Sequence, residues 1–165
     1  MFSYTLGFII YKNQILMLNR HKAPWMGSWN GLGGKIKAHE SPKECIKREV
    51  LEETGLDLDV NKFIYKGNVT WNTFHANGQG LYIYIYELDQ VPYLKLPLSV
   101  DEGILSFKDI SWLCDFENEG VAKNIPYFLP SVINEETIYS YDCIFKKGIL
   151  KKVKKKKVMI CQNLL

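Results

Sequence analysis

The sequence predicts a layered α/β domain, and two segments carry that prediction. Residues 81–87 (LYIYIYE) alternate aliphatic side chains with tyrosines, the period of two that is typical of a β-strand. Because both faces of this strand are bulky, we expect other layers to cover both of them. Residues 42–54 predict an α-helix with clear ends. A chain of 165 residues suits one such domain with a buried core.

The first elements along the chain form a predicted hairpin. Residues 3–10 and 14–19 are apolar runs on either side of a Lys12-Asn13 turn, which predicts two antiparallel strands. Residues 24–35 (PWMGSWNGLGGK) are rich in glycine and are expected to form a loop.

The helix over 42–54 is punctuated at both ends. Ser41 is a typical N-cap, and Glu44 three residues later completes a capping box. Pro42 occupies the first helical position, where its missing N–H costs nothing. Gly55 lies where a C-cap glycine belongs. Together these residues fix where the helix begins and ends.

Shorter patterns predict the other elements. Pro126 and Pro130 bracket the start of a second helix, over about 126–135. We expect a single domain over 1–158 and a frayed tail over 159–165. The remaining predictions are a strand over 62–72, a turn over 77–80, and strands over 104–108, 137–146 and 149–158.

The composition is that of a globular protein without a membrane span. Hydrophobic residues make up 47% and charged residues 24% of the chain. No apolar run approaches the roughly 20 residues that cross a bilayer. The four cysteines form no Cys-x-x-Cys pair. We therefore expect reduced thiols and a cytoplasmic location.

The net charge of +3 hides two regions of opposite sign. Residues 146–157 (KKGILKKVKKKK) hold eight lysines and no acid, so the rest of the chain has 13 basic against 18 acidic residues, a charge of −5. An acidic body suits a protein that binds a divalent cation. The lysine segment has two interpretations: contact with nucleic acid or a membrane surface, or a solvated strand edge whose lysines discourage edge pairing.

Three glutamates of the first helix form a carboxylate cluster. At about 100° per residue, Glu49, Glu52 and Glu53 fall on one side of the helix. Their mutual repulsion is tolerated on a solvated face or offset by a cation. Hard divalent cations such as Mg²⁺ prefer oxygen ligands. By itself, the cluster is more typical of a solvated face.

The cluster belongs to a longer pattern over residues 34–56, GKIKAHESPKECIKREVLEETGL. Its fixed residues at fixed spacing arise by chance in about one sequence per million or fewer. The pattern resembles the signature of the Nudix hydrolases at all its positions. The resemblance implies an α/β/α sandwich with a mixed central sheet. It also implies hydrolysis of a nucleoside diphosphate linked to another group, with Mg²⁺ as cofactor and Mn²⁺ as the alternative.

The resemblance also assigns roles to individual residues. It makes Glu49, Glu52 and Glu53 metal ligands, joined by the carbonyl of Gly33. Arg48 becomes the residue that orients a glutamate of the pattern, either Glu40 or Glu52. Glycines beside the helix are expected because backbone without Cβ approaches phosphate and metal closely. The residues expected to take part in catalysis are Arg48, Glu52, Glu53 and Glu102.

The flanking residues resemble the MutT-like branch, which includes 8-oxo-dGTP diphosphatases. This resemblance rests on the segment Trp29-Asn30-Gly31-Leu32-Gly33-Gly34-Lys35. Glu102 resembles a late glutamate that approaches the metal, although an exposed loop acid is the alternative. Asn124 falls where the branch reads the purine edge, although it also suits a helix N-cap. The residues expected to bind substrate are Arg20, Asn30, Gly33, Gly34, Lys35 and Asn124, and Trp25, Trp29 and Trp71 are candidates for stacking on a base.

These observations favour metal-dependent hydrolysis of a purine nucleoside triphosphate, with 8-oxo-dGTP as a candidate, to the monophosphate and pyrophosphate. Such an enzyme sanitises the nucleotide pool, and its partner is a small nucleotide rather than a membrane. The alternatives are another nucleoside diphosphate derivative (an RNA 5′ end, a dinucleoside polyphosphate or ADP-ribose) and a non-catalytic nucleotide sensor. The lysine segment 146–157 motivates the RNA alternative.

Overall fold

A mixed sheet of nine strands forms the centre of the protein, whose computed structural model describes residues 2–72 and 80–158. The strand order is β6-β7-β2-β1-β5-β4-β8-β9, with β3 paired to β2. The β1–β5 and β4–β8 pairs are parallel and the others are antiparallel. The strands are β1 Tyr4–Tyr11, β2 Gln14–Arg20, β3 Trp29–Asn30, β4 Ile64–Trp71, β5 Leu81–Glu87, β6 Leu98–Val100, β7 Gly103–Asp109, β8 Tyr139–Lys146 and β9 Ile149–Lys157.

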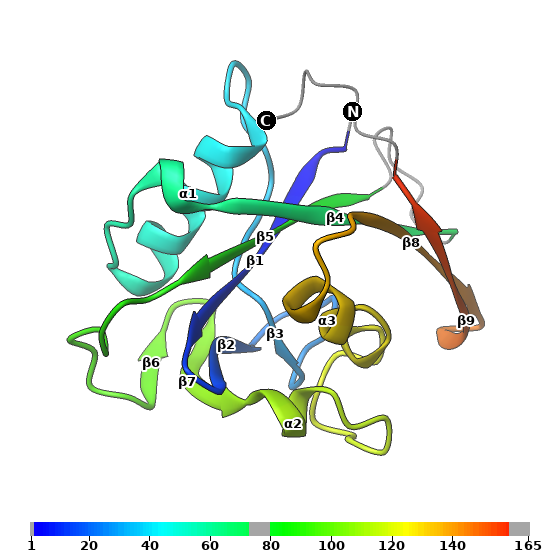
Figure 1. Ribbon diagram of the computed structural model, residues 1–165. Coiled ribbons are helices and arrows are strands. Elements are labelled where there is room, and N and C mark those ends of the chain that lie inside the picture. The colour runs from blue at the N-terminus through cyan, green and yellow to red at the C-terminus, as the bar shows by residue number, and fades with distance from the viewer. Residues whose placement is uncertain (1, 73–79, 159–165) are drawn as a thin grey trace.

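Helices cover both faces of this sheet (Figure 1). Helix α1 (Pro42–Thr54) packs its buried Ile46 and Val50 with the tyrosines of β5. Helix α3 (Ile125–Asn134) packs with the aliphatic residues of β5 on the other face. The short helix α2 (Ile110–Leu113) follows β7, and a 3₁₀ turn, η1 (Val60–Lys62), precedes β4. The predicted α/β/α sandwich with a mixed sheet is therefore confirmed.

The elements with strong local signals lie where the sequence places them. Helix α1 spans 42–54, with the Ser41–Glu44 capping box formed and Gly55 as a left-handed C-cap. Strand β5 spans 81–87 and is buried on both faces up to Tyr86. The first hairpin turns at Lys12, which has a positive φ of 53°.

Weaker patterns gave less accurate boundaries. The strand predicted over 62–72 begins at Ile64, because η1 takes the preceding residues. Helix α3 begins and ends one residue before the predicted range of 126–135, and Pro130 lies in its interior. It removes one helical hydrogen bond, and burial of Phe128, Leu129 and Val132 around it offsets that loss. The tail predicted over 159–165, and residues 77–79 of the predicted turn, lie outside the described residues.

Two further observations concern membranes and thiols. Among the helices of residues 2–72 and 80–158, none is long and apolar enough to span a bilayer. The three cysteines in this part of the chain, Cys45, Cys114 and Cys143, are all free thiols.

Candidate active site

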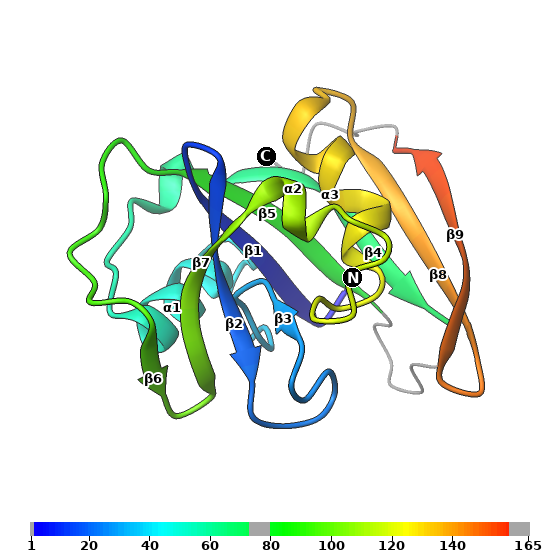
Figure 2. The same ribbon diagram turned by 90° about the horizontal axis from the view of Figure 1, so that it is seen from below.

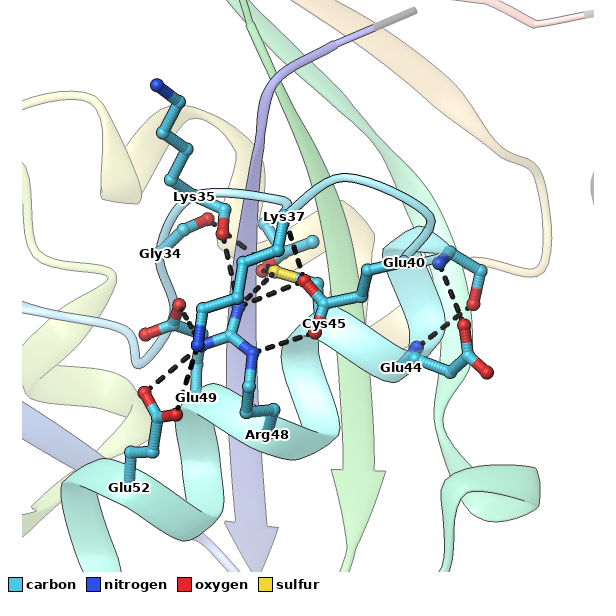
Figure 3. A network of polar contacts seen from close by, with 11 residues as sticks. Gly34, Lys35, Lys37, Glu40, Glu44, Cys45, Arg48, Glu49 and Glu52 are labelled. Atoms are coloured by element: carbon cyan, nitrogen blue, oxygen red, sulfur yellow. Dashed lines mark hydrogen bonds and ion pairs between the residues drawn. The ribbon is translucent and has the colours of Figure 1, made fainter.

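Arg48 is the centre of the polar network on α1 (Figure 3). Its Nη1 donates to Oε1 of Glu49 at 2.7 Å and to Oε2 of Glu52 at 3.0 Å. Its Nε and Nη2 donate to the two oxygens of Glu40, at 2.7 and 3.0 Å. These hydrogen bonds to Arg48 lower the pKa of Glu40 from 4.5 to about 2. The guanidinium therefore contacts both proposed partners, Glu40 and Glu52, and Glu49 as well.

Glu53 is the buried member of the carboxylate cluster, with 6% of its surface exposed. Its Oε2 accepts a hydrogen bond from the backbone N–H of Gly33 at 3.0 Å. Its Oε1 is buried and has no hydrogen-bond partner among the described residues. Burial, together with the neighbouring charges of Glu102 and Glu49, raises the pKa of Glu53 to about 9. A buried carboxylate with a free oxygen is a costly arrangement that a bound cation relieves.

The glycine loop packs so tightly that two of its glycines leave no room for a side chain. A Cβ on Gly33, whose φ is 137°, would lie 2.3 Å from the carbonyl oxygen of Thr5. A Cβ on Gly34 would lie 2.5 Å from the carboxylate of Glu49. The backbone of Gly34 is held in place because its carbonyl accepts the N–H of Thr5 at 2.9 Å. The loop can thus approach both β1 and the carboxylates of α1.

The carboxylates border a small cavity of about 450 Å³. Glu53 contributes from α1, and Glu102 contributes from the turn between β6 and β7. The backbone carbonyl of Glu102 accepts the N–H of His21 at 2.9 Å, which ties this turn to the end of β2. The lining residues are Glu49, Glu52, Glu53, Val100, Asp101 and Glu102.

The residues around this cavity fit a divalent cation. Carboxylate oxygens are the ligands that Mg²⁺ and Mn²⁺ prefer, and Glu53 offers a buried oxygen that has no hydrogen-bond partner in the described part of the chain. Among the described residues, however, no three His, Cys, Asp or Glu side chains already stand as a closed ligand set. The reason is visible in the contacts: Glu49 and Glu52 are turned toward Arg48. A cation must compete with Arg48 for these two carboxylates.

A second, larger cavity of about 1120 Å³ shares Glu49, Glu52 and Glu102 with the small one. Most residues predicted to bind substrate line it, namely Arg20, Asn30, Gly33, Gly34 and Lys35. Arg20 is held by a hydrogen bond from its Nε to the carbonyl of Pro24 at 3.1 Å. The carboxamide of Asn30 accepts the N–H of Gly31 at 2.9 Å.

Asn124 lies apart from these residues. It is buried, with 5% of its surface exposed, and it lines neither of the two cavities. It precedes α3 as its N-cap, but its side chain makes no capping hydrogen bond. Burial raises the pKa of the Cys143 thiol to about 12, and a hydrogen bond with Asn124 opposes this rise. The contact of Asn124 with substrate remains a prediction.

Aromatic side chains line the large cavity. Trp25 and Phe145 approach with ring centroids 6.0 Å apart, and Trp71 and Tyr4 also line the cavity. Trp29 does not line the cavity. Its ring makes a cation–π contact with Lys108, whose Nζ lies 4.1 Å from the ring centroid. Sequence reasoning missed Phe145, because only the parallel pairing of β8 with β4 brings it to the end of β4, where its backbone hydrogen-bonds with the side chain of Asn72. A local pattern cannot show such a non-local contact.

A comparison with known protein families identifies the family of the chain. The family model described as NUDIX domain matches residues 1–119. The chain belongs to the Nudix family. The family predicted from residues 34–56 is therefore confirmed, while the roles of individual residues remain predictions.

Two curated Nudix relatives resemble part of the chain. Oxidized purine nucleoside triphosphate hydrolase of Mus musculus is 30% identical over 88 residues, which are 53% of this chain and 54% of that protein. Its counterpart of Danio rerio is 30% identical over 98 residues, or 59% of this chain and 60% of that protein. The chain thus spans just over half the length of these relatives.

Solved structures share the fold over a longer stretch. The MutT protein from Bacillus halodurans has a TM-score of 0.70 and 22% identity, and the match covers 92% of this chain and 95% of that one. A bifunctional NMN adenylyltransferase/ADP ribose pyrophosphatase from Francisella tularensis, complexed with AMP and Mn ion, has a TM-score of 0.60 and 18% identity, over 81% and 41% of the two chains. At these identities the likeness concerns the Nudix fold alone.

Proposed function

We propose that this Nudix chain hydrolyses a purine nucleoside triphosphate to the monophosphate and pyrophosphate, with oxidised purines among its substrates. The observation that carries the proposal is the unpartnered buried oxygen of Glu53, in a carboxylate-lined cavity that adjoins a nucleotide-sized one. Resemblance to the oxidized purine nucleoside triphosphate hydrolases supports the choice of substrate. Sanitising the nucleotide pool in the cytoplasm is the corresponding role.

The reaction consumes one water and breaks the bridge between the α- and β-phosphates. The oxygen of the water ends on one of the two products, and its protons pass to the products or the solvent. A divalent cation, Mg²⁺ or Mn²⁺, supplies charge neutralisation and lowers the pKa of water when bound. Glu49, Glu52 and Glu53 are the proposed ligands on α1, with Glu102 and the carbonyl of Gly33 beside them.

The other proposed roles follow from position and charge. Arg48 is the proposed orienting residue, because it binds one oxygen of Glu49 and one of Glu52, and both carboxylate residues line the two cavities. Glu102 is the proposed base for the attacking water, because its carboxylate lines both cavities and has no hydrogen bond to another described residue that competes for it. Arg20 and Lys35 line the same cavity and supply positive charge for the phosphates. Positioning and charge are the main needs of phosphoryl transfer.

The opposite wall of the cavity is the proposed site of the base. Trp25 and Phe145 offer ring faces for stacking. Asn30 lines the cavity as well, and an amide is suited to hydrogen bonds with a purine edge. Asn124 reaches this edge only if its side chain leaves the thiol of Cys143, so we rank its contribution below that of Asn30.

The test is pyrophosphate release from dGTP and 8-oxo-dGTP in Mg²⁺ and in Mn²⁺, with ADP-ribose and capped RNA as competing substrates. Glu53→Gln is expected to lower kcat by about 10³-fold or more, because removing a ligand removes several kcal/mol of transition-state stabilisation. Glu136→Gln, an exposed glutamate away from both cavities, is the matched control. Equal rates for the wild type and Glu53→Gln contradict the mechanism. Tight nucleotide binding without any turnover indicates a sensor instead.

A further inference from the structure

The β8–β9 hairpin forms the edge of the sheet opposite β6 (Figure 2). It carries eight of the 21 Lys and Arg residues of the chain. Its tip is Lys147-Gly148, both with positive φ, and Lys146 precedes it. Strand β9 adds the exposed lysines 151, 152, 154, 155, 156 and 157. We name these eight residues, including Lys146 and Lys147, the lysine hairpin.

The charge of the lysine hairpin is almost uncompensated. Among the residues that the structure describes, Lys155 is the one lysine of the hairpin in an ion pair, with Glu135 at 2.9 Å. Asp142 of β8 lies opposite Lys154 but accepts the hydroxyl of Thr70 instead. The segments outside the described residues, 73–79 and 159–165, contain no Asp or Glu. Seven of the eight lysines therefore share one edge of the sheet without an ion pair among the described residues, an arrangement that attracts a polyanion.

The lysines of the hairpin form a row that starts beside the large cavity and runs along β9. Phe145 and Gly148 of the hairpin line this cavity. In register, Lys152, Lys154 and Lys156 lie opposite Ile144, Asp142 and Ser140, so they share one face of β8–β9. Successive members of this row are about 6.7 Å apart, since a strand rises about 3.3–3.4 Å per residue. The other face is engaged by α3, where Lys155 also donates to Ser131 at 2.7 Å.

We propose that the lysine hairpin binds the phosphodiester backbone of single-stranded RNA whose 5′-terminal nucleotide occupies the large cavity. The triphosphate of that nucleotide then points to the carboxylates of α1, its base stacks on the face of Trp25 or of Phe145, which both line the cavity, and its 3′-oxygen leads past Gly148 to the lysine row. This combination of aromatic rings and a basic track is what single-stranded nucleic acids require. The inference rests on the proposed function for its chemical step, which is the same hydrolysis at a different 5′ end.

Charge alone does not favour a bilayer equally well. A membrane-bound surface gains from several apolar side chains that enter the interface, whereas β9 exposes Ile149 alone and packs Leu150 and Val153 against the core. Protection of a sheet edge explains lysines on the edge strand β9. It does not explain Lys146 at the end of β8 or Lys147 in the hairpin tip, next to the cavity-lining Gly148.

The experiment uses two triple variants of the full chain. The first is Lys152→Gln, Lys154→Gln and Lys156→Gln, and none of these lysines lines the cavity. The matched control is Lys12→Gln, Lys62→Gln and Lys95→Gln, which removes equal charge from exposed sites elsewhere. Binding of a short unstructured 5′-monophosphorylated RNA is measured by fluorescence anisotropy without metal, at salt concentrations from about 50 to 200 mM. Turnover is measured separately with 5′-triphosphorylated RNA and with free dGTP in Mg²⁺.

We expect the first variant to bind RNA about tenfold more weakly at low salt, and its salt slope to fall by about 2, since each single-strand phosphate contact contributes about 0.7. Its kcat/KM falls on triphosphorylated RNA and stays within about twofold on free dGTP, and the control triple variant matches the wild type throughout. RNA binding that is equal in both triple variants overturns the proposal. Binding to vesicles of phosphatidylserine is measured alongside, and a loss confined to these vesicles also overturns the proposal. Because binding is measured without turnover, RNA binding with no hydrolysis of any substrate overturns the proposed function but not the hairpin site.

Discussion

Arg48 and Glu40 face each other in a two-point ion pair, in which Nε and Nη2 of the guanidinium lie 2.7 and 3.0 Å from the two oxygens of the carboxylate. The remaining Nη1 reaches Glu49 and Glu52. Glu40 therefore fixes the orientation of the guanidinium, and the guanidinium fixes the two proposed ligands. A planar fork is needed for this geometry, which a lysine cannot reproduce.

The first prediction concerns this pair. Glu40→Gln is expected to destabilise the fold by about 1–3 kcal/mol at pH 7, the usual loss for a hydrogen bond to a charged group. The pKa of Glu40 is lowered in the folded state from 4.5 to about 2, so its contribution is present above pH 4.5 and is lost as the pH falls toward 2. Thermal melts of the wild type and Glu40→Gln should differ most near neutrality and converge at the acidic end. A difference that stays constant over this range contradicts the assignment.

The second prediction concerns Glu53 in the absence of metal. Because its pKa is raised to about 9, the folded state keeps a proton that the unfolded state releases above pH 4.5. The stability of the metal-free protein should therefore decrease as the pH rises from about 5 to 9. Glu53→Gln removes this dependence and should raise the melting temperature at pH 8.

Metal addition completes the test of Glu53. Mg²⁺ is expected to raise the melting temperature of the wild type, because a ligand that binds only the folded state stabilises it, and to have little effect on Glu53→Gln. Melts in EDTA and in Mg²⁺ measure both effects, with Glu136→Gln as the control that behaves as the wild type. An equal response to Mg²⁺ in Glu53→Gln removes Glu53 from the proposed ligand set.

The sequence predicted the parts of this site whose signals are local. The ends of α1 follow from Ser41, Glu44 and Gly55, residues that act on their own helix turns, and the structure reproduces them. The sequence did not decide whether Arg48 pairs with Glu40 or with Glu52, because the long side chain of Arg48 can reach both. In the structure Arg48 pairs with both glutamates, because its guanidinium has enough N–H donors for several carboxylates.

Non-local and very short elements were not predictable in the same way. Strand β6 and helix α2 have three and four residues, too few for any periodicity to emerge. Phe145 enters the cavity only through the pairing of β8 with β4, which joins segments far apart in the chain. Asn124 shows the opposite case, in which a plausible local position leads to a buried side chain outside both cavities.

The third prediction contrasts two adjacent glycines. Gly33 has a φ of 137°, and Gly33→Ala places a Cβ 2.3 Å from the backbone carbonyl oxygen of Thr5. Neither the backbone of Thr5 nor the φ of residue 33 can adjust easily. We expect a loss of stability of about 1–3 kcal/mol or more. In Gly34→Ala the Cβ instead meets the carboxylate of Glu49, a side-chain end that can move. This variant should keep its melting temperature within a few degrees and lose about 10²-fold in kcat, because a ligand is displaced. Melting temperatures and turnover of both variants separate the two effects, and a fully active Gly34→Ala contradicts the role of Glu49.

The fourth prediction concerns the aromatic wall. Phe145→Ala and Trp25→Ala each remove one of two rings whose centroids lie 6.0 Å apart beside the cavity. Stacking on a base is worth about 1–3 kcal/mol, so KM for a nucleoside triphosphate should rise about 5- to 100-fold while kcat changes little, since the carboxylates of α1 are untouched. Phe116→Ala is the control, because this exposed ring packs on Tyr127 away from the cavity. Steady-state kinetics with dGTP give both constants. A fall in kcat at unchanged KM would place the base elsewhere and assign the two rings a purely structural part in holding the β8–β9 hairpin against the loop of Trp25.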